Sequence, residues 1–143
     1  MRRRLGRLIA PVLLLLAASC TDDKRAAEIA CQQRLVDVPN LKMTKAGAGE
    51  SAVASSFAQL SRRYAGMPLD GCTEGQAYTA KSFSRLTREL ADTAGAAEQA
   101  LEGGPSGIRH SQAFMAFTAN LEQFENRRRV AREQLAEMKA GKP

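Results

Sequence analysis

Hydrophobic positions from residue 24 onwards recur every three or four residues, which is the periodicity of amphipathic α-helices. Four such segments are separated by stretches that contain glycine or proline. The helices predicted from this pattern span residues 22–36 or 24–36, 50–64, 76–101, and 106–139 or 108–139. Alanine, glutamine, arginine and glutamate are frequent in them, and these residue types favour helices.

The predicted helix ends coincide with residues that interrupt helices. The first helix must end before Pro39, because the residue before a proline is disfavoured in the α region. Gly66 ends the second helix, and residues 67–75 form a turn-rich loop. The third helix stops at residues 103–105, where two glycines are followed by a proline.

The last predicted helix is the longest and carries an apolar seam with heptad spacing. Its seam positions are Phe114, Phe117, Leu121, Phe124, Arg128, Ala131, Leu135 and Met138. Because Arg128 interrupts the seam, we expect the aromatic half to pack in the core and the C-terminal half to project. The segments together predict an all-α fold, a small bundle of three to four antiparallel helices forming one domain over residues 25–143.

The first 19 residues follow a different pattern. Four arginines precede an apolar run over residues 8–16, and three small residues follow it: Arg2, Arg3, Arg4 and Arg7, then Ala17, Ala18 and Ser19. A basic segment, an apolar segment and small residues in this order are typical of a secretory signal peptide. The apolar stretch is shorter than the roughly 20 residues that span a bilayer. We therefore predict a cleaved signal peptide over residues 1–19.

The sequence Ala17-Ala18-Ser19-Cys20 resembles the lipobox of bacterial lipoproteins. The resemblance implies that Cys20 receives a diacylglyceryl group, becomes the first residue of the mature chain, and anchors it in the membrane. Residues 20–24 would then be the lipidated cysteine and a short polar tether. Thr21 after the cysteine points to the outer membrane, because aspartate at that place often retains lipoproteins at the inner membrane. The alternative is ordinary cleavage after Ser19, which would release a soluble periplasmic or secreted protein.

The cysteine count bears on the same question. The chain has three cysteines, and lipidation of Cys20 would leave Cys31 and Cys72 as an even pair. In an oxidising compartment such a pair is expected to form a disulfide, and closing this loop would stabilise the fold by about 4 kcal/mol. The alternative is two buried free cysteines on helix faces.

Net charge changes when the signal peptide is removed. The full chain carries +6, with 21 basic and 15 acidic residues. Four of the basic residues and none of the acidic ones lie in residues 1–19, so 17 basic and 15 acidic residues remain, a charge of +2. This balance and the absence of tryptophan disfavour a nucleic-acid partner.

Candidate catalytic residues are few. His110 is the single histidine, and it has no cysteine or carboxylate at metal-ligand spacing, so we expect it to be an exposed or capping side chain. The serines lack a partner base and are expected on helix surfaces: Ser55, Ser56, Ser61, Ser82 and Ser84. The carboxylates of the last helix alternate with arginines, for example Glu125 with Arg129, as on a solvated face: Glu122, Glu125, Glu133 and Glu137. We predict no catalytic residue, cofactor or metal.

The arginines of the last helix form one candidate interaction patch: Arg127, Arg128, Arg129 and Arg132. They could contact anionic lipid headgroups or an acidic partner. The other interpretation is a solvated helix face balanced by nearby glutamates.

These observations predict a lipid-anchored, non-catalytic helical protein on the periplasmic face of the outer membrane, acting through contacts with an unidentified protein partner. It would be an accessory part of a secretion or conjugation machine, or an inhibitor or exclusion factor. The alternative is a structural spacer between the outer membrane and the cell wall, because a long heptad-bearing helix behind a lipid anchor is similar to the small murein-linked lipoproteins. Those proteins end in a lysine, whereas Lys142 is followed here by Pro143.

Overall fold

The computed structural model describes residues 9–37 and 51–141, with the backbone alone for residues 9–20, 109 and 110. All regular structure in these ranges is helical: α1 (Ile9–Val36), α2 (Ala52–Ala65), α3 (Glu74–Glu102), α4 (Gly104–His110) and α5 (Gln112–Lys139). The prediction of an all-α fold with a disulfide between Cys31 and Cys72 is therefore confirmed. Within the described ranges, no helix combines the length and apolar character needed to cross a membrane.

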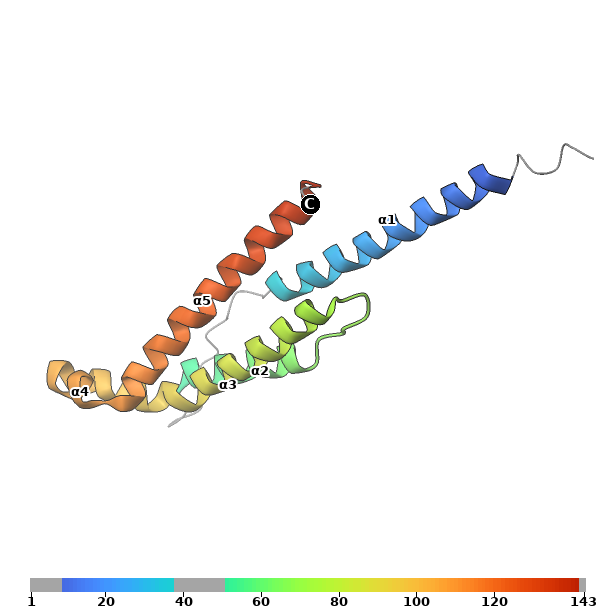
Figure 1. The fold of residues 1–143 in the computed structure, drawn as a ribbon. Coiled ribbons are helices and arrows are strands. Elements are labelled where there is room, and N and C mark those ends of the chain that lie inside the picture. The colour runs from blue at the N-terminus through green and yellow to red at the C-terminus, as the bar shows by residue number, and fades with distance from the viewer. Residues whose placement is uncertain (1–8, 38–50, 142–143) are drawn as a thin grey trace, which may run out of the picture.

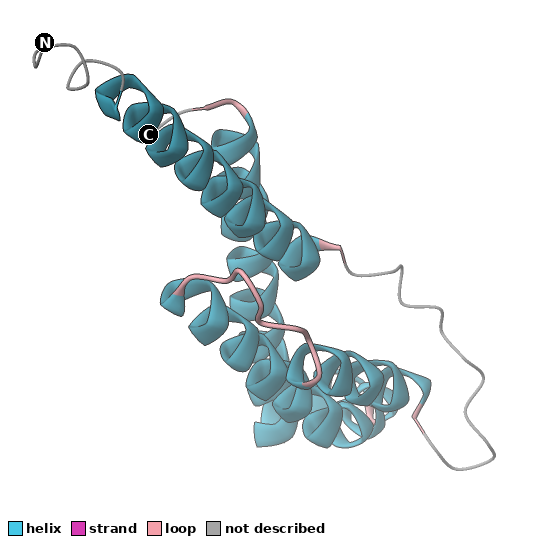
Figure 2. Cartoon of the chain, turned by 90° about the vertical axis from the view of Figure 1, so that its right-hand side faces the viewer, coloured by secondary structure: helices cyan, strands magenta, loops and turns pink. Residues whose placement is uncertain are grey.

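The helices form an elongated bundle (Figure 1). α2 and α3 lie side by side, α4 turns the chain at the far end of α3, and α5 returns along α3. α1 contacts the C-terminal half of α5 and extends away from the bundle toward its own N-terminus (Figures 1 and 2). The start of α1 and the α4 turn are thus at opposite ends of the molecule.

The core lies where α2, α3 and α5 meet and is built around aromatic rings. Phe83 and Phe124 pack edge to face with centroids 5.6 Å apart, and Tyr64 lies 5.0 Å from Phe83. Phe57 contacts both Phe124 and Phe117 edge to face. Aliphatic side chains surround the rings, including one from α1: Leu35, Leu60, Leu86 and Leu90. Such edge-to-face pairs add about 0.5–1.5 kcal/mol each to the burial of the rings.

The seam of α5 is buried differently from the prediction. Phe124, Ala131 and Leu135 are buried, whereas Phe114 and Phe117 are half-buried. The C-terminal half, expected to project, is instead packed against α1. The sequence did not reveal this contact, because the period of α5 shows which side is apolar but not which helix covers it.

The break between α4 and α5 was also missed. The sequence predicted one helix from residue 106 or 108, but the chain leaves the helical conformation at Ser111 (φ −91°, ψ 106°). The Ser111 hydroxyl accepts a hydrogen bond from the Phe114 amide at 3.1 Å, which caps α5. The described residues therefore contain five helices rather than three to four.

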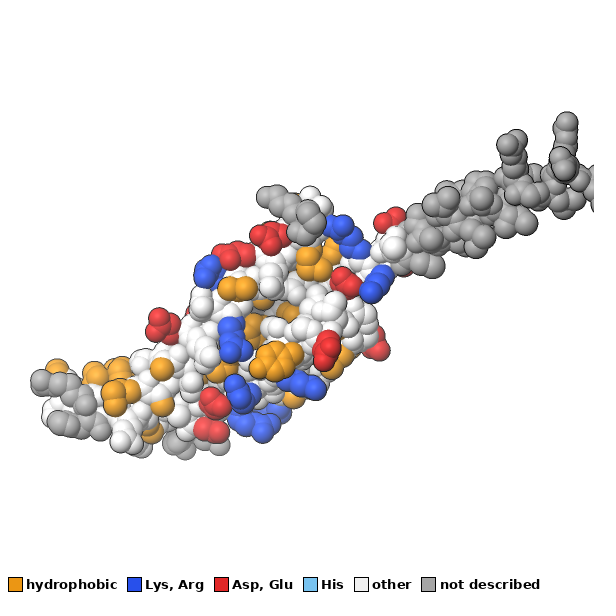
Figure 3. All heavy atoms as spheres, in the orientation of Figure 1, with side chains coloured by type: hydrophobic (Ala, Val, Ile, Leu, Met, Phe, Trp, Pro, Cys, Tyr) orange, Lys and Arg blue, Asp and Glu red, His pale blue; other side chains and the backbone are white. Residues whose placement is uncertain are grey.

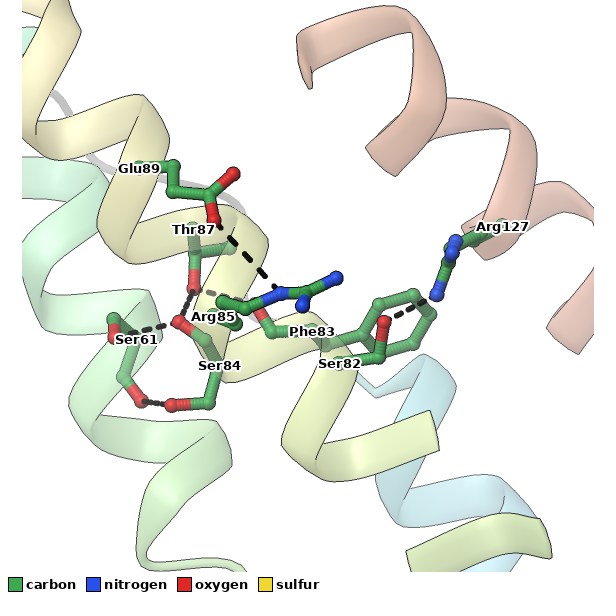
Figure 4. Close-up of polar contacts among 8 residues, drawn as sticks. All are labelled: Ser61, Ser82, Phe83, Ser84, Arg85, Thr87, Glu89 and Arg127. Carbon is green, nitrogen blue, oxygen red and sulfur yellow. Dashed lines mark hydrogen bonds and ion pairs between the residues drawn. The ribbon is translucent and has the colours of Figure 1, made fainter. Parts of the chain in front are cut away.

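Three of the serines expected on helix surfaces are buried: Ser56, Ser61 and Ser82. Ser61 and Ser84 exchange hydrogen bonds across α2 and α3, each hydroxyl donating to the backbone carbonyl of the other residue, at 2.9 and 3.1 Å (Figure 4). The prediction was wrong for these residues, because small hydroxyl side chains allow two helix backbones to approach closely. The hydroxyls of Ser61 and Ser82 have hydrogen-bond partners, whereas the buried hydroxyl of Ser56 has none among the described residues.

Gly71 lets the α2–α3 loop approach α1. Its φ of +73° lies in the left-handed region, and a Cβ at this position would come within 2.8 Å of the Cβ of Ala27 in α1. Glycine is required on both counts, because other residues disfavour this backbone conformation and any side chain would push the loop away from α1.

We predict that Gly71→Ala lowers the free energy of unfolding by more than Gly104→Ala, measured by urea denaturation. Gly104 also has a positive φ, +66°, but a Cβ there meets nothing within 4 Å. The control therefore reports the backbone cost alone, about 1–2 kcal/mol, and the difference reports the contact with Ala27. Equal losses in the two variants would show that the close approach to α1 contributes nothing.

Candidate functional site at the junction of α1, α3 and α5

A disulfide joins α1 to the loop before α3. The Cα atoms of Cys31 and Cys72 are 5.3 Å apart, and Cys31 is fully buried. Arg34, one turn further along α1, donates from Nη2 to the carbonyl oxygen of Asp70 at 2.8 Å and lies 3.7 Å from the Cys72 sulfur. The loop is therefore held to α1 on both sides of Gly71.

Two glutamines next to the disulfide connect three helices. Gln76 Nε2 donates to the Glu28 carbonyl at 2.9 Å and to Gln32 Oε1 at 3.1 Å, both in α1. Gln32 Nε2 in turn donates to the Ala131 carbonyl of α5 at 2.9 Å. Both glutamines are buried, and the network satisfies their amide groups. We call the disulfide and these two glutamines the clamp.

Gln76 also caps α3. Its Oε1 accepts from the Thr73 amide at 2.9 Å, while the Thr73 hydroxyl accepts from the Gln76 amide at 3.2 Å, which is a capping box. The Thr-x-x-Gln spacing is visible in the sequence and could have identified the start of α3 and a special role for Gln76. The contact of Gln76 with α1 has no such signal, because it depends on how the helices pack.

A polar hollow of about 470 Å³ lies beside the clamp. Its walls come from α1, α3 and α5 and contain two carboxylates: Glu28, Gln32, Thr73, Gly75, Gln76, Thr79, Gln134, Glu137 and Met138. The described residues contain no group of three potential metal-ligating side chains. The hollow offers hydrogen-bonding groups and negative charge, but the hydrogen bonds of Gln32 and Gln76 are already used in joining helices.

The turns of α1 that follow residue 20 meet the C-terminal end of α5. Residues 21–26 are helical and exposed, so the predicted polar tether is itself part of α1. Arg25 donates from Nη2 to the Met138 carbonyl at 3.3 Å, and Lys139 Nζ donates to Gln33 Oε1 at 2.6 Å. The side chain of Cys20, the predicted lipidation site, lies outside the described residues, whereas its backbone is within α1.

The four arginines of α5 that form the predicted interaction patch each have a different contact. Arg127 donates to the Ser82 hydroxyl of α3 (Figure 4). Arg128 lies over the Phe124 ring, 5.5 Å from its centroid, and 3.7 Å from a carboxylate oxygen of Glu125. Arg129 pairs with Glu133 at 2.7 Å, and Arg132 donates to the Arg128 carbonyl at 3.3 Å. The predicted pairing of Glu125 with Arg129 is thus replaced by Glu125 with Arg128.

Tyr64 is the titratable group most affected by its surroundings among the described residues. Burial raises the pKa of its phenol to about 12, against the opposing effect of nearby Arg128, Arg63 and Arg132. The hydroxyl donates to the Leu35 carbonyl at 3.4 Å near the end of α1. The neutral phenol therefore holds α1 to the core, and its ionisation would place a charge in an apolar site.

The remaining predicted residues do not form a constellation in the described structure. The side chain of His110 lies outside the described residues. Glu122, Glu125, Glu133 and Glu137 are exposed along α5. No protein family, curated protein or solved structure matches this chain.

We predict that Gln76→Ala lowers the free energy of unfolding by about 2–3 kcal/mol, because it removes a helix cap and two hydrogen bonds to α1 and leaves buried partners unsatisfied. The matched control is Gln134→Ala, whose exposed side chain accepts one hydrogen bond from Gln32 at 3.3 Å. We expect it to cost less than about 0.5 kcal/mol. Urea denaturation followed by circular dichroism distinguishes the two, and similar losses would show that the glutamine network does not join the helices.

Stability is predicted to fall at high pH because of Tyr64. Burial raises the pKa of Tyr64 in the folded chain from 10.0 to about 12. The contribution of the neutral phenol to the free energy of unfolding is therefore complete below pH 10 and is lost as the pH rises through 12. The expected loss is about 2–3 kcal/mol. Tyr64→Phe should lack this part of the decrease when unfolding free energies of the two proteins are compared from pH 9 to 12. Parallel pH curves would contradict the assignment.

Proposed function

We propose that this protein is a lipid-anchored helical protein of the bacterial envelope, facing the periplasm from the outer membrane and acting through contacts with a protein partner. Lipidation of Cys20 and removal of residues 1–19 are part of the proposal. It is supported by the lipobox-like sequence together with the way α1 leads from that cysteine into the bundle.

The observation that carries the proposal is the continuity of α1 from the neighbour of Cys20 to the clamp. α1 is unbroken over Ile9–Val36, and Cys31 is eleven residues beyond Cys20, about 16 Å along a helix. Arg25, five residues beyond Cys20, already contacts α5. An anchor at Cys20 would therefore be joined rigidly to the bundle and would hold it close to the membrane.

The opposite end of the molecule supports a role in contacting another protein. α3 has 29 residues, which corresponds to about 43 Å, and it leads from the clamp to the α4 turn. Leu101 and Met115 near this turn are 54% and 55% exposed. Exposed apolar side chains mark protein contacts where they form a contiguous patch, and these two would contribute to such a contact. In this arrangement, the end that carries Cys20 holds the bundle at the membrane, and the end at the α4 turn faces the periplasm.

Metabolic labelling with an alkyne analogue of palmitate tests the proposal. The wild-type chain should be labelled and should fractionate with outer membranes, and Cys20→Ala should lose both properties. Cys31→Ser is the matched control, because it removes another cysteine and should keep the label. An unlabelled wild-type chain, or label that persists in Cys20→Ala, would refute the anchoring.

A further inference from the structure

The outer face of α3 carries a tyrosine followed by a row of three cations. Tyr78, Lys81, Arg85 and Arg88 follow one another at steps of three, four and three residues, which places them on one side of the helix. This side is opposite the buried positions such as Phe83 and Leu90. We call these four residues the α3 stripe. Figure 3 shows Lys and Arg side chains gathered over this part of the molecule.

The charges of the α3 stripe are weakly compensated. The side chains of Lys81 and Arg88 form no hydrogen bond or ion pair with the described residues. Arg85 lies 3.8 Å from Glu89, and its side chain is 68% exposed. Arg127 of α5 adds a fourth cation beside the stripe, and its contact there is the uncharged hydroxyl of Ser82 (Figure 4). Glu74 and Asp92 lie on the same side of α3, beyond the two ends of the row.

Apolar groups adjoin the α3 stripe. Tyr78 is 69% exposed, the largest value among the exposed large hydrophobic side chains that the structure describes. A hollow of about 260 Å³ lies between the end of α2 and α3, with Lys81 at its side and Met67, Leu69 and Tyr64 in its wall. Leu69 is 42% exposed. An apolar hollow next to a row of cations fits a ligand that has both apolar and anionic groups.

We infer that the α3 stripe and this hollow bind an acidic peptide segment of the partner protein, with carboxylates on Lys81, Arg85 and Arg88 and an apolar side chain in the hollow. The inference rests on the proposed function, since it names the chemistry of the partner. Charge complementarity selects an acidic segment, because opposite charges across an interface guide encounter and exclude basic partners. Lys81 to Arg88 spans about 10 Å along the helix, which two or three carboxylates of one segment can follow.

Fluorescence anisotropy tests the inference with a fluorescein-labelled peptide of glutamate, aspartate and leucine and the full chain purified from whole cells extracted with a non-ionic detergent. Binding should weaken with added salt. Replacing the three cations together, Lys81→Gln, Arg85→Gln and Arg88→Gln, should weaken it by about tenfold or more. Leu69→Ser should weaken it by a smaller factor, because it alters the hollow and leaves the charges.

The matched control removes the same charge from exposed positions elsewhere, through Lys24→Gln, Arg129→Gln and Lys139→Gln, and should change affinity less than about twofold. Equal weakening by the two triple variants would overturn the inference, and so would binding of anionic vesicles but not of the peptide. Peptide binding does not require the lipid. If the peptide does not bind while Cys20 is labelled, the peptide site on α3 is refuted and the anchoring is not. If Cys20 is unlabelled while the peptide binds, the anchoring is refuted and the peptide site is not.

Discussion

The clamp between α1 and the start of α3 is the constraint on which the arrangement of the helices depends. The covalent bond between Cys31 and Cys72 fixes α1 against the loop, and Gln76 and Gln32 extend this fixed point to α5 through hydrogen bonds. Apart from this corner, α1 contributes little to the aromatic core, where its main buried residue is Leu35. Without the clamp, α1 would be attached to the bundle only through its contacts with the C-terminal half of α5 and through the packing of its last turns on the core.

Polar contacts set the register of helices whose apolar surfaces are modest. Aromatic residues make up 5% of the chain, and many core positions of α3 are alanine. Small apolar side chains pack well but allow neighbouring helices to slide past one another. The reciprocal bonds of Ser61 and Ser84 and the bonds of Gln32 to α5 permit a single register, because a shift would leave buried polar groups unsatisfied.

The sequence predicted features that depend on neighbouring residues, such as helices and their ends, and features that follow from the number of residues of one type, such as the disulfide. The helix period gave the four amphipathic segments, Pro39 and Gly66 gave boundaries, and the number of cysteines led to the disulfide. Contacts between distant segments could not be predicted, because period and composition do not state which helix covers which. The covering of the C-terminal half of α5 by α1, the burial of Ser61 and Ser82 and the contact of Gln76 with α1 are of this kind. The break at Ser111 could in part have been predicted, because serine is a common residue at the start of a helix. The regular spacing of apolar residues on both sides of it favoured one continuous helix instead.

The helical conformation of residues 21–24 has a consequence for the orientation of an anchored bundle. A flexible tether sets only the greatest distance between a membrane and a protein, and adding a residue lengthens it slightly. In a continuous helix each residue also rotates everything that follows by about 100° around the helix axis. The number of residues between Cys20 and Cys31 would then decide which side of the bundle faces along the membrane and which faces a neighbouring protein. Under the proposed anchoring, the length of this short segment sets the orientation of the bundle around the axis of α1 as well as its distance from the membrane.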